Sequence, residues 1–303
     1  MAAGGVGAYF GARLAAAGHE VHFIARGAHL AAIRRAGLRV LSIHGDLHLP
    51  APRVTDDPAA IGPVDIVLFA VKLWDVEMAA AGARPLLGTH TRLITLQNGV
   101  DSYERVSAVI GAEYAVPGVA SVASVIAEPG VVRQTSSFHA ITFGRPDCAR
   151  DTVLARFAET SAPANCVVKL ADDIESERWR KFVVLTGTSG ATSLTRMPLG
   201  AILDDTDTRA LLRDLMRETL RVGRARGVAL DDGFVDDRMA FLDANAPRDM
   251  RTSMAHDLMR GNRLEVEWLN GTVSRMGAAL GIPTPRNDTV HAGLKPHRFG
   301  GAR

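Results

Sequence analysis

Polar residues that follow apolar segments are the first candidates for chemistry in this chain. Lys72 directly follows the apolar segment 64–71, and Asn98 follows the segment 91–97. In an open α/β sheet, ligands bind outside the carboxyl ends of the strands, so both residues could contact a ligand. Each also has a plainer interpretation, Lys72 as an ordinary lysine at a helix start and Asn98-Gly99 as a turn.

Lys181 and Glu265 are a second pair of candidates, and each again has a structural alternative. Glu177 stands four residues before Lys181, which is the spacing of a surface ion pair on a helix. Asn262 and Glu265 have the spacing of a capping box, so the glutamate could simply close a helix start. Composition does not decide between these interpretations.

The glycine-rich start has the spacing of the dinucleotide fingerprint GxGxxG. Ala2 occupies the first glycine position and is followed by Gly4, Gly5, Val6 and Gly7. Gly4 would let the backbone approach a pyrophosphate, Gly7 would let the next helix pack closely, and the helix N-terminus would face the phosphates. The alternative is an N-terminal tail with accidental glycines. An amphipathic helix and a strand follow, which favours the fingerprint.

The fingerprint should follow a strand, yet the sequence starts inside it. We therefore expect a Rossmann domain that lacks its first strand, with unpaired backbone on the neighbouring strands. Our hypothesis is that the native chain starts several residues upstream, and N-terminal sequencing of the native protein would test it.

Arg26 stands near the end of the next strand, where an NAD enzyme needs an acidic residue for the ribose hydroxyls. A guanidinium there would instead pair with a 2′-phosphate, which favours NADP(H). The alternative is an exposed arginine in a loop.

The elements that must position these residues change in type along the chain. Short apolar segments at 20–26, 64–71 and 91–97 predict buried strands, and 9–17 and 76–87 between them predict helices. Strand-like segments follow at 115–127, 131–134 and 139–143, and again at 165–170. From a capping box at 172–175 onward, the segments 205–226, 232–245, 253–260 and 263–280 have helical spacing. We predict an α/β Rossmann domain at 1–170 and an all-α domain at 171–303.

Charge and composition exclude several classes of protein. With 35 basic and 33 acidic residues, the net charge of +2 gives little attraction for nucleic acid or an anionic membrane. The uncharged segment 114–127 is shorter than the ~20 residues of a membrane span. The two cysteines lack metal-ligand spacing and suggest a cytoplasmic protein. His44 and His48 flank a predicted hairpin turn, so we expect no metal site.

Short motifs occur along the chain at 4–14, 23–27, 71–72, 96–99, 179–182, 196–200, 252–254 and 269–271. Taken together, these motifs resemble those of the ketopantoate reductase (2-dehydropantoate 2-reductase) family. The resemblance implies a Rossmann domain joined to an all-α domain, with the active site in the cleft between them. It also implies hydride transfer from NADPH to the ketone carbon of a 2-oxo acid, usually giving pantoate for coenzyme A synthesis.

The resemblance also assigns roles to individual residues. Lys181 matches the catalytic lysine, whose ammonium can stabilise and protonate the carbonyl oxygen as hydride arrives. Glu265 matches a glutamate that holds the substrate and the nicotinamide ribose. Asn98 matches an asparagine beside the nicotinamide and substrate, Lys72 a cofactor-binding lysine, and Ser253 a substrate-binding serine.

Three positions depart from the family's pattern. Leu185 and Ser189 stand one and two helical turns after Lys181, and Leu199 stands in the next loop, where the best-characterised members have substrate-binding asparagines. Losing these amides would disfavour a polar substrate. The alternatives are therefore a paralogue acting on a less polar 2-oxo acid or another ketone, and an NADP-binding sensor without turnover. The sequence leaves a homodimer open.

Overall fold

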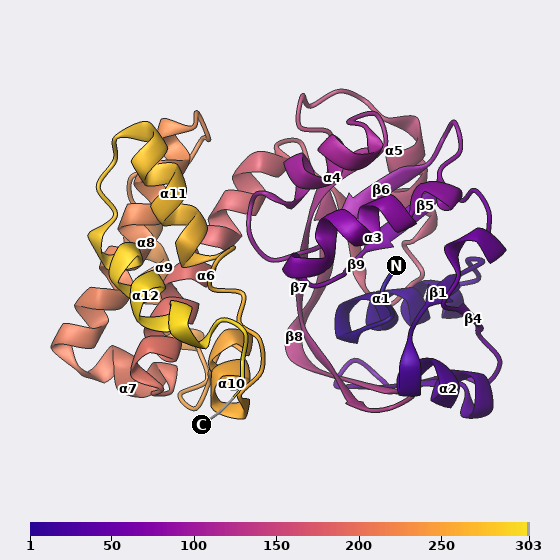
Figure 1. Ribbon diagram of the computed structural model, residues 1–303, viewed down its shortest axis with the longest axis horizontal. Helices are drawn as coiled ribbons and strands as arrows, with labels where there is room; N and C mark the ends of the chain where they lie inside the picture. Colours follow the sequence, from indigo (N-terminus) through magenta and orange to yellow (C-terminus); the bar gives the residue numbers. More distant parts are fainter. Residues whose placement is uncertain (302–303) are drawn as a thin grey trace. The chain divides into compact units, whose positions relative to one another are not determined.

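The computed structural model describes residues 1–301, which form two compact units (Figure 1). The first unit comprises Met1–Gln97 and Ser102–Ile174, and it holds all the strands of the described chain. The second unit comprises Asn98–Asp101 and the chain from Glu175 onward, and its regular elements are helices. An α/β region followed by an all-helical region confirms the predicted fold class.

The first unit is built on a mostly parallel sheet. Strands β5, β6 and β7 pair in parallel, β7 and β8 pair antiparallel, and β2 and β9 each pair in parallel with β8. The predicted strands are confirmed, and the segments predicted at 131–134 and 139–143 form one continuous strand. The larger sheet contains β2 (Leu38–Ser42), β3 (Leu47–Leu49), β5 (Ile66–Phe69), β6 (Arg92–Thr95), β7 (Ala115–Glu128), β8 (Val131–Phe143) and β9 (Val167–Leu170), while β1 (His22–Ile24) and β4 (Arg53–Thr55) pair separately.

Residues 1–3 precede α1 and belong to no strand, and Ala2 has a left-handed backbone with φ of 62°. The amide of Ala3 donates to Ile24 O at the end of β1, at 2.8 Å. The carbonyl of Met1 accepts from Ala70 N, just after β5, at 3.1 Å. These contacts satisfy backbone groups at the carboxyl ends of two strands that do not pair with each other.

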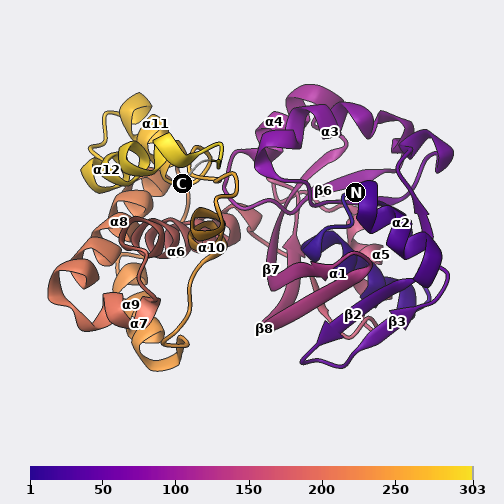
Figure 2. The ribbon, with the colours of Figure 1, turned by 60° about the horizontal axis from the view of Figure 1, so that its bottom comes forward.

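Helices pack on this sheet, and one of them begins at the glycine-rich segment. Helix α1 (Gly5–Ala16) lies against β7 and β8 (Figure 2). The helix predicted at 76–87 ends earlier, at Gly82, and Pro85 has no amide hydrogen with which a continued helix could bond Ala81 O. The remaining helices of this unit are α2 (Gly27–Ala36), α3 (Val76–Gly82), α4 (Ser102–Ile110) and α5 (Thr152–Thr160).

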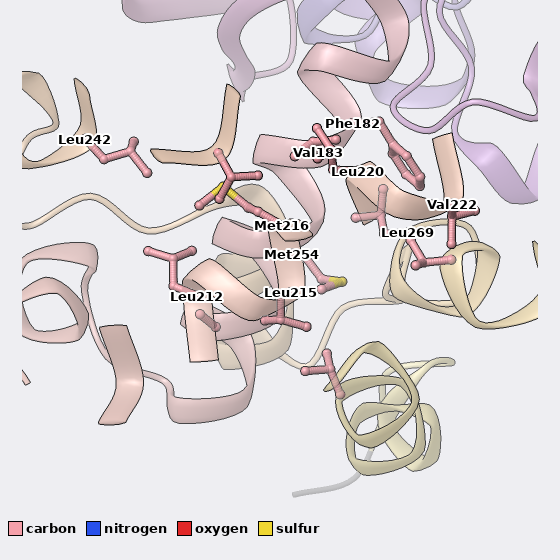
Figure 3. Close-up of a cluster of buried hydrophobic side chains, with 14 of the residues drawn as sticks. Phe182, Val183, Leu212, Leu215, Met216, Leu220, Val222, Leu242, Met254 and Leu269 are labelled. Atoms are coloured by element: carbon pink, nitrogen blue, oxygen red, sulfur yellow. The ribbon is translucent and has the colours of Figure 1, made fainter. Parts of the chain in front are cut away.

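The second unit has its own hydrophobic core, formed by side chains that recur at helical spacing. Phe182 and Val183 of α6 pack with side chains of α8 (Figure 3). Within residues 1–301, no helix combines the length and apolar character needed to cross a membrane. The helices of this unit are α6 (Ile174–Thr195), α7 (Leu199–Asp204), α8 (Thr206–Ala225), α9 (Phe234–Asn245), α10 (Ser253–Arg260), α11 (Asn270–Leu280) and α12 (Pro285–Leu294).

The predicted start of one helix is wrong. The helical spacing at 263–280 predicts a helix from residue 263, but α11 begins at Asn270. Gly261 ends α10 in the left-handed conformation, with φ of 70°. The amide of Leu264 then donates to Arg298 O at 2.9 Å, so this segment pairs with the end of the chain instead of forming a helix.

Candidate active site

Lys181 and Asn98 meet within the second unit. Lys181 lies on α6, and its Nζ donates a hydrogen bond to Asn98 Oδ1 at 3.0 Å. Neighbouring α6 residues such as Trp179, Phe182 and Val183 are buried in the core, which fixes the helix that carries Lys181. The structure thus brings together two candidates that the sequence placed in different elements.

Glu265 lies near the same ammonium. It is 7% exposed and stands in an irregular segment that leads into the turn before α11. No helix of the described chain begins at Asn262, so the capping-box interpretation of Glu265 is wrong. The amides of Trp268 and Leu269 donate to Glu265 O at 3.0 and 3.1 Å, which holds the turn that follows it.

The environment of Lys181 changes its acidity. Burial lowers the pKa of Lys181 from its ordinary value to about 8, and attraction to the Glu265 carboxylate opposes this shift. An ammonium with a pKa of about 8 can release a proton near neutral pH far more readily than an ordinary lysine. The pair therefore combines a proton donor with a nearby carboxylate that keeps it charged.

Arg178 is a buried cation beside this pair that the sequence did not single out. It is 4% exposed and lies three residues before Lys181 on α6. Its Nη2 donates to the carbonyl oxygen of Val100 at 2.5 Å, and its Nη1 pairs with Glu175. The only signal in the sequence was its helical spacing from Lys181, which does not predict burial.

The other predicted substrate-binding residues have different surroundings. Ser253 is exposed at the first position of α10. Leu185 is half-buried and packs against the core of the second unit, and Leu199 is 1% exposed in the same core. Ser189 is fully buried, and its Oγ has no hydrogen-bond partner in the described chain. Their roles stay predictions.

The glycines of the glycine-rich segment in the first unit differ in the space available for a side chain. A Cβ at Gly4 would meet no atom within 4 Å, and Gly4 is the N-cap of α1. A Cβ at Gly5 would lie 2.2 Å from Ser124 O, and one at Gly7 would lie 2.2 Å from Ala2 O. Val6 is half-buried against the core. Open space at Gly4, beside the amides of a helix N-terminus, fits the approach of a pyrophosphate.

The two predicted cationic groups of the cofactor site stand after the strands β1 and β5. Arg26 is the N-cap of α2, and its side chain is 73% exposed and lies 4.0 Å from Asp75. Lys72 follows β5, with its Nζ 5.5 Å from the centre of the Trp74 ring. An exposed guanidinium at the end of β1 fits a 2′-phosphate, and it equally fits the alternative of a solvated loop arginine.

The segment that contains His44 and His48, where we expected no metal site, forms the predicted hairpin. β2 and β3 pair antiparallel across a turn that contains His44 and Gly45, and Gly45 has φ of 99°. His44 stacks on His139 with ring centres 3.7 Å apart. No group of three metal-ligating side chains suited to an ion occurs among residues 1–301.

Comparison with known proteins gives consistent matches over both units. The family model described as "Ketopantoate reductase PanE/ApbA" matches residues 2–147, and the model of that family's C-terminal part matches residues 173–298. The 2-dehydropantoate 2-reductase of Mesorhizobium japonicum is 32% identical over 311 residues, covering 96% of this chain and 94% of the relative.

Solved structures show the same relationship. The 2-dehydropantoate 2-reductase of Geobacter metallireducens superposes with a TM-score of 0.90 and 32% identity, covering 98% of each chain. A dimeric ketopantoate reductase of Staphylococcus aureus has a TM-score of 0.82 at 21% identity, covering 97% of this chain and 96% of that one, and it shows a shared fold.

Proposed function

Because this chain belongs to the ketopantoate reductase family, we propose that it reduces 2-dehydropantoate to pantoate, a step toward coenzyme A. The chain is an NADP-dependent oxidoreductase. The observation that carries the proposal is the Lys181 ammonium, held 3.0 Å from Asn98 Oδ1 with a pKa lowered to about 8.

Lys181 is the proposed proton donor. NADPH, when bound, would supply the hydride for the ketone carbon. Negative charge then develops on the carbonyl oxygen, and the Lys181 ammonium stabilises it and transfers a proton to it. Hydride and proton together convert the ketone into a secondary alcohol, and Lys181 is left as a neutral amine that takes up a proton from solvent.

Asn98 and Glu265 support Lys181 in this proposal. The Asn98 amide oxygen accepts from Nζ and so directs the ammonium. The Glu265 carboxylate favours the charged form and therefore keeps the donor protonated near neutral pH. Glu265 and Ser253 would also bind substrate, as the family resemblance implies.

The proposed cofactor site lies in the first unit. Gly4, Gly5, Val6 and Gly7 would place the start of α1 against the pyrophosphate, with Gly4 as the position of closest approach. Arg26 would bind the 2′-phosphate. Lys72 would contribute a second cation on the cofactor side.

A related 2-oxo acid with a less polar side chain is the second candidate substrate. Leu185 and Leu199 have no hydrogen-bonding side chain, and only the hydroxyl of Ser189 remains at the three departing positions. An apolar substituent would suit the half-buried Leu185 better than a hydroxyl that would be buried without a partner.

The deciding experiment measures NADPH oxidation with 2-dehydropantoate and with branched 2-oxo acids that lack its hydroxyl. The proposal expects turnover with 2-dehydropantoate at the highest kcat/KM. Faster turnover of an apolar 2-oxo acid would identify the second substrate class and leave the mechanism intact. No turnover with any acid, together with tight NADPH binding, would instead favour the sensor.

Assembly and location complete the proposal. We propose a homodimer, for which the dimeric Staphylococcus aureus neighbour is the precedent, and its mass in solution tests this. We propose a cytoplasmic location, which the two free thiols Cys148 and Cys166 support.

A further inference from the structure

We propose that Arg178 is a positioning residue for hydride transfer, because it fastens the segment Asn98–Asp101 to α6 and so holds Asn98 against Lys181. This inference rests on the proposed function, since it assigns a task to Arg178 in that reaction. Arg178 itself donates to the carbonyl oxygen of Val100 and pairs with Glu175.

The burial of Arg178 shows that its partners matter. Its side chain is 3% exposed, and a buried guanidinium is costly unless its donors are satisfied. Nη1 pairs with Glu175 one turn earlier on α6, which neutralises the charge beside Lys181. Nη2 donates to Val100 O, a carbonyl in a different part of the chain. The second bond ties the segment Asn98–Asp101 to the helix.

The geometry of α6 links the hydrogen bond between Arg178 and Val100 to the position of Lys181. Residues three apart on a helix share a face, so Arg178 and Lys181 both point toward the same segment. Arg178 holds the backbone of Val100, and Lys181 holds the side chain of Asn98, two residues earlier. One contact therefore fixes the backbone from which the other projects.

A second contact confines the segment at Gly99. A Cβ at Gly99 would lie 3.2 Å from the carbonyl oxygen of Trp268, in the turn that follows Glu265. Gly99 has φ of 95°, a conformation that favours glycine. Val100 is 2% exposed in the core of the second unit. The segment thus contacts both α6 and the turn that follows Glu265, and a displaced Val100 would displace Asn98.

The kinetic test compares Arg178→Met with Arg180→Met. Methionine keeps the apolar stem and removes the donors, and Arg180 is a matched control because its side chain is 43% exposed and pairs at the surface with Asp231. We expect Arg178→Met to lower kcat by roughly 100-fold, since small misplacements of a catalytic group have effects of that order. The Kd of Arg178→Met for NADPH should stay within about twofold of the wild-type value. Arg180→Met should match the wild type in both kcat and this Kd.

A double-mutant cycle with Asn98→Ala tests whether Arg178 acts through Asn98. If it does, the double variant loses no more kcat than the more damaged single variant. If the kcat losses of the two single variants multiply in the double variant, the proposal is overturned. Should Arg178→Met be unfolded at the assay temperature, Arg178→Gln takes its place in the cycle, because its shorter side chain keeps a donor but falls short of Val100.

Hydrogen exchange tests the anchoring without any turnover. Amides of residues 98–101 should exchange at least about tenfold faster in Arg178→Met than in the wild type and Arg180→Met. Unchanged exchange would overturn the inference. If the wild type reduces no 2-oxo acid but the exchange result holds, the proposed function fails while the anchoring by Arg178 stands.

Discussion

The ammonium of Lys181 lies 3.0 Å from the amide oxygen of Asn98, although 83 positions separate them in the sequence. An ammonium has three donors, and Asn98 takes one of them and so fixes the direction of the others. The buried Glu265 acts on the same ammonium through its charge. Proton donation by Lys181 therefore depends on residues from three separate parts of the chain.

Replacing Lys181 tests proton donation directly. Lys181→Ala should lower kcat by about 10²–10⁴-fold, the usual range for losing a general acid. Lys181→Arg keeps a positive charge but does not release a proton near neutral pH, so it should also be slow. NADPH oxidation with the preferred 2-oxo acid measures both. Activity of Lys181→Ala within tenfold of the wild type would contradict the assignment.

The pH dependence of reduction should follow the pKa of Lys181. Because the charged form donates the proton, kcat/KM should fall as the pH rises through about 8. Glu265→Gln removes the attraction that supports the ammonium, so the pKa of Lys181 falls and the decline moves to lower pH. A shift to higher pH in that variant would show that the assigned interaction has the wrong sign.

The glycines of the fingerprint should respond differently to an added methyl group. Gly4→Ala meets open space, so it should fold with a near-normal Tm but bind NADPH at least about tenfold more weakly if the pyrophosphate lies there. Gly7→Ala would place Cβ 2.2 Å from Ala2 O and should lower the Tm. Thermal unfolding and NADPH titration separate the two effects. Normal NADPH affinity in Gly4→Ala would place the pyrophosphate elsewhere.

Arg26 should distinguish the two nicotinamide cofactors. Arg26→Ala should weaken NADPH binding by about 10–100-fold, the range for a lost charge-assisted hydrogen bond, and change NADH binding little. Arg34→Ala is the control, because Arg34 is an exposed arginine of α2 that pairs with Asp56. If Arg26→Ala loses equal affinity for NADPH and NADH, Arg26 does not bind the 2′-phosphate.

The stacked pair of His44 and His139 should make the stability of the chain sensitive to acid. Burial lowers the pKa of His139, and repulsion by His44 and Arg13 adds to this shift. A histidine with a lowered pKa stabilises the fold above the unfolded pKa of about 6.5, and this contribution is lost as the pH falls below it.

His139→Gln should therefore show a smaller drop in the free energy of unfolding between about pH 7.5 and about pH 5 than the wild type does. Urea denaturation at several pH values measures this drop. His90→Gln, at an exposed position, should behave as the wild type. An identical pH dependence in His139→Gln and the wild type would show that the stack does not titrate with folding.

Local sequence patterns determined the architecture of this protein. Apolar segments bounded by Gly, Pro and Asn predicted most of the strands but not β4, and helical spacing predicted α8, α9 and α10 but not α7 or α12. These patterns are informative because side chains repeat every two residues on a strand and every 3.6 on a helix. The same patterns placed Gly4 at a helix start and Lys72 and Asn98 after strands.

Only the tertiary structure decided how the candidate catalytic residues are surrounded. The spacing of Asn262 and Glu265 predicted a helix start, but the pairing of Leu264 with Arg298 prevents it. The burial of Arg178 and the contact of Asn98 with Lys181 also depend on packing between distant segments. Such contacts leave no periodic trace in the sequence, because burial and pairing across the fold depend on the whole chain, whereas periodicity reports only neighbours along one element.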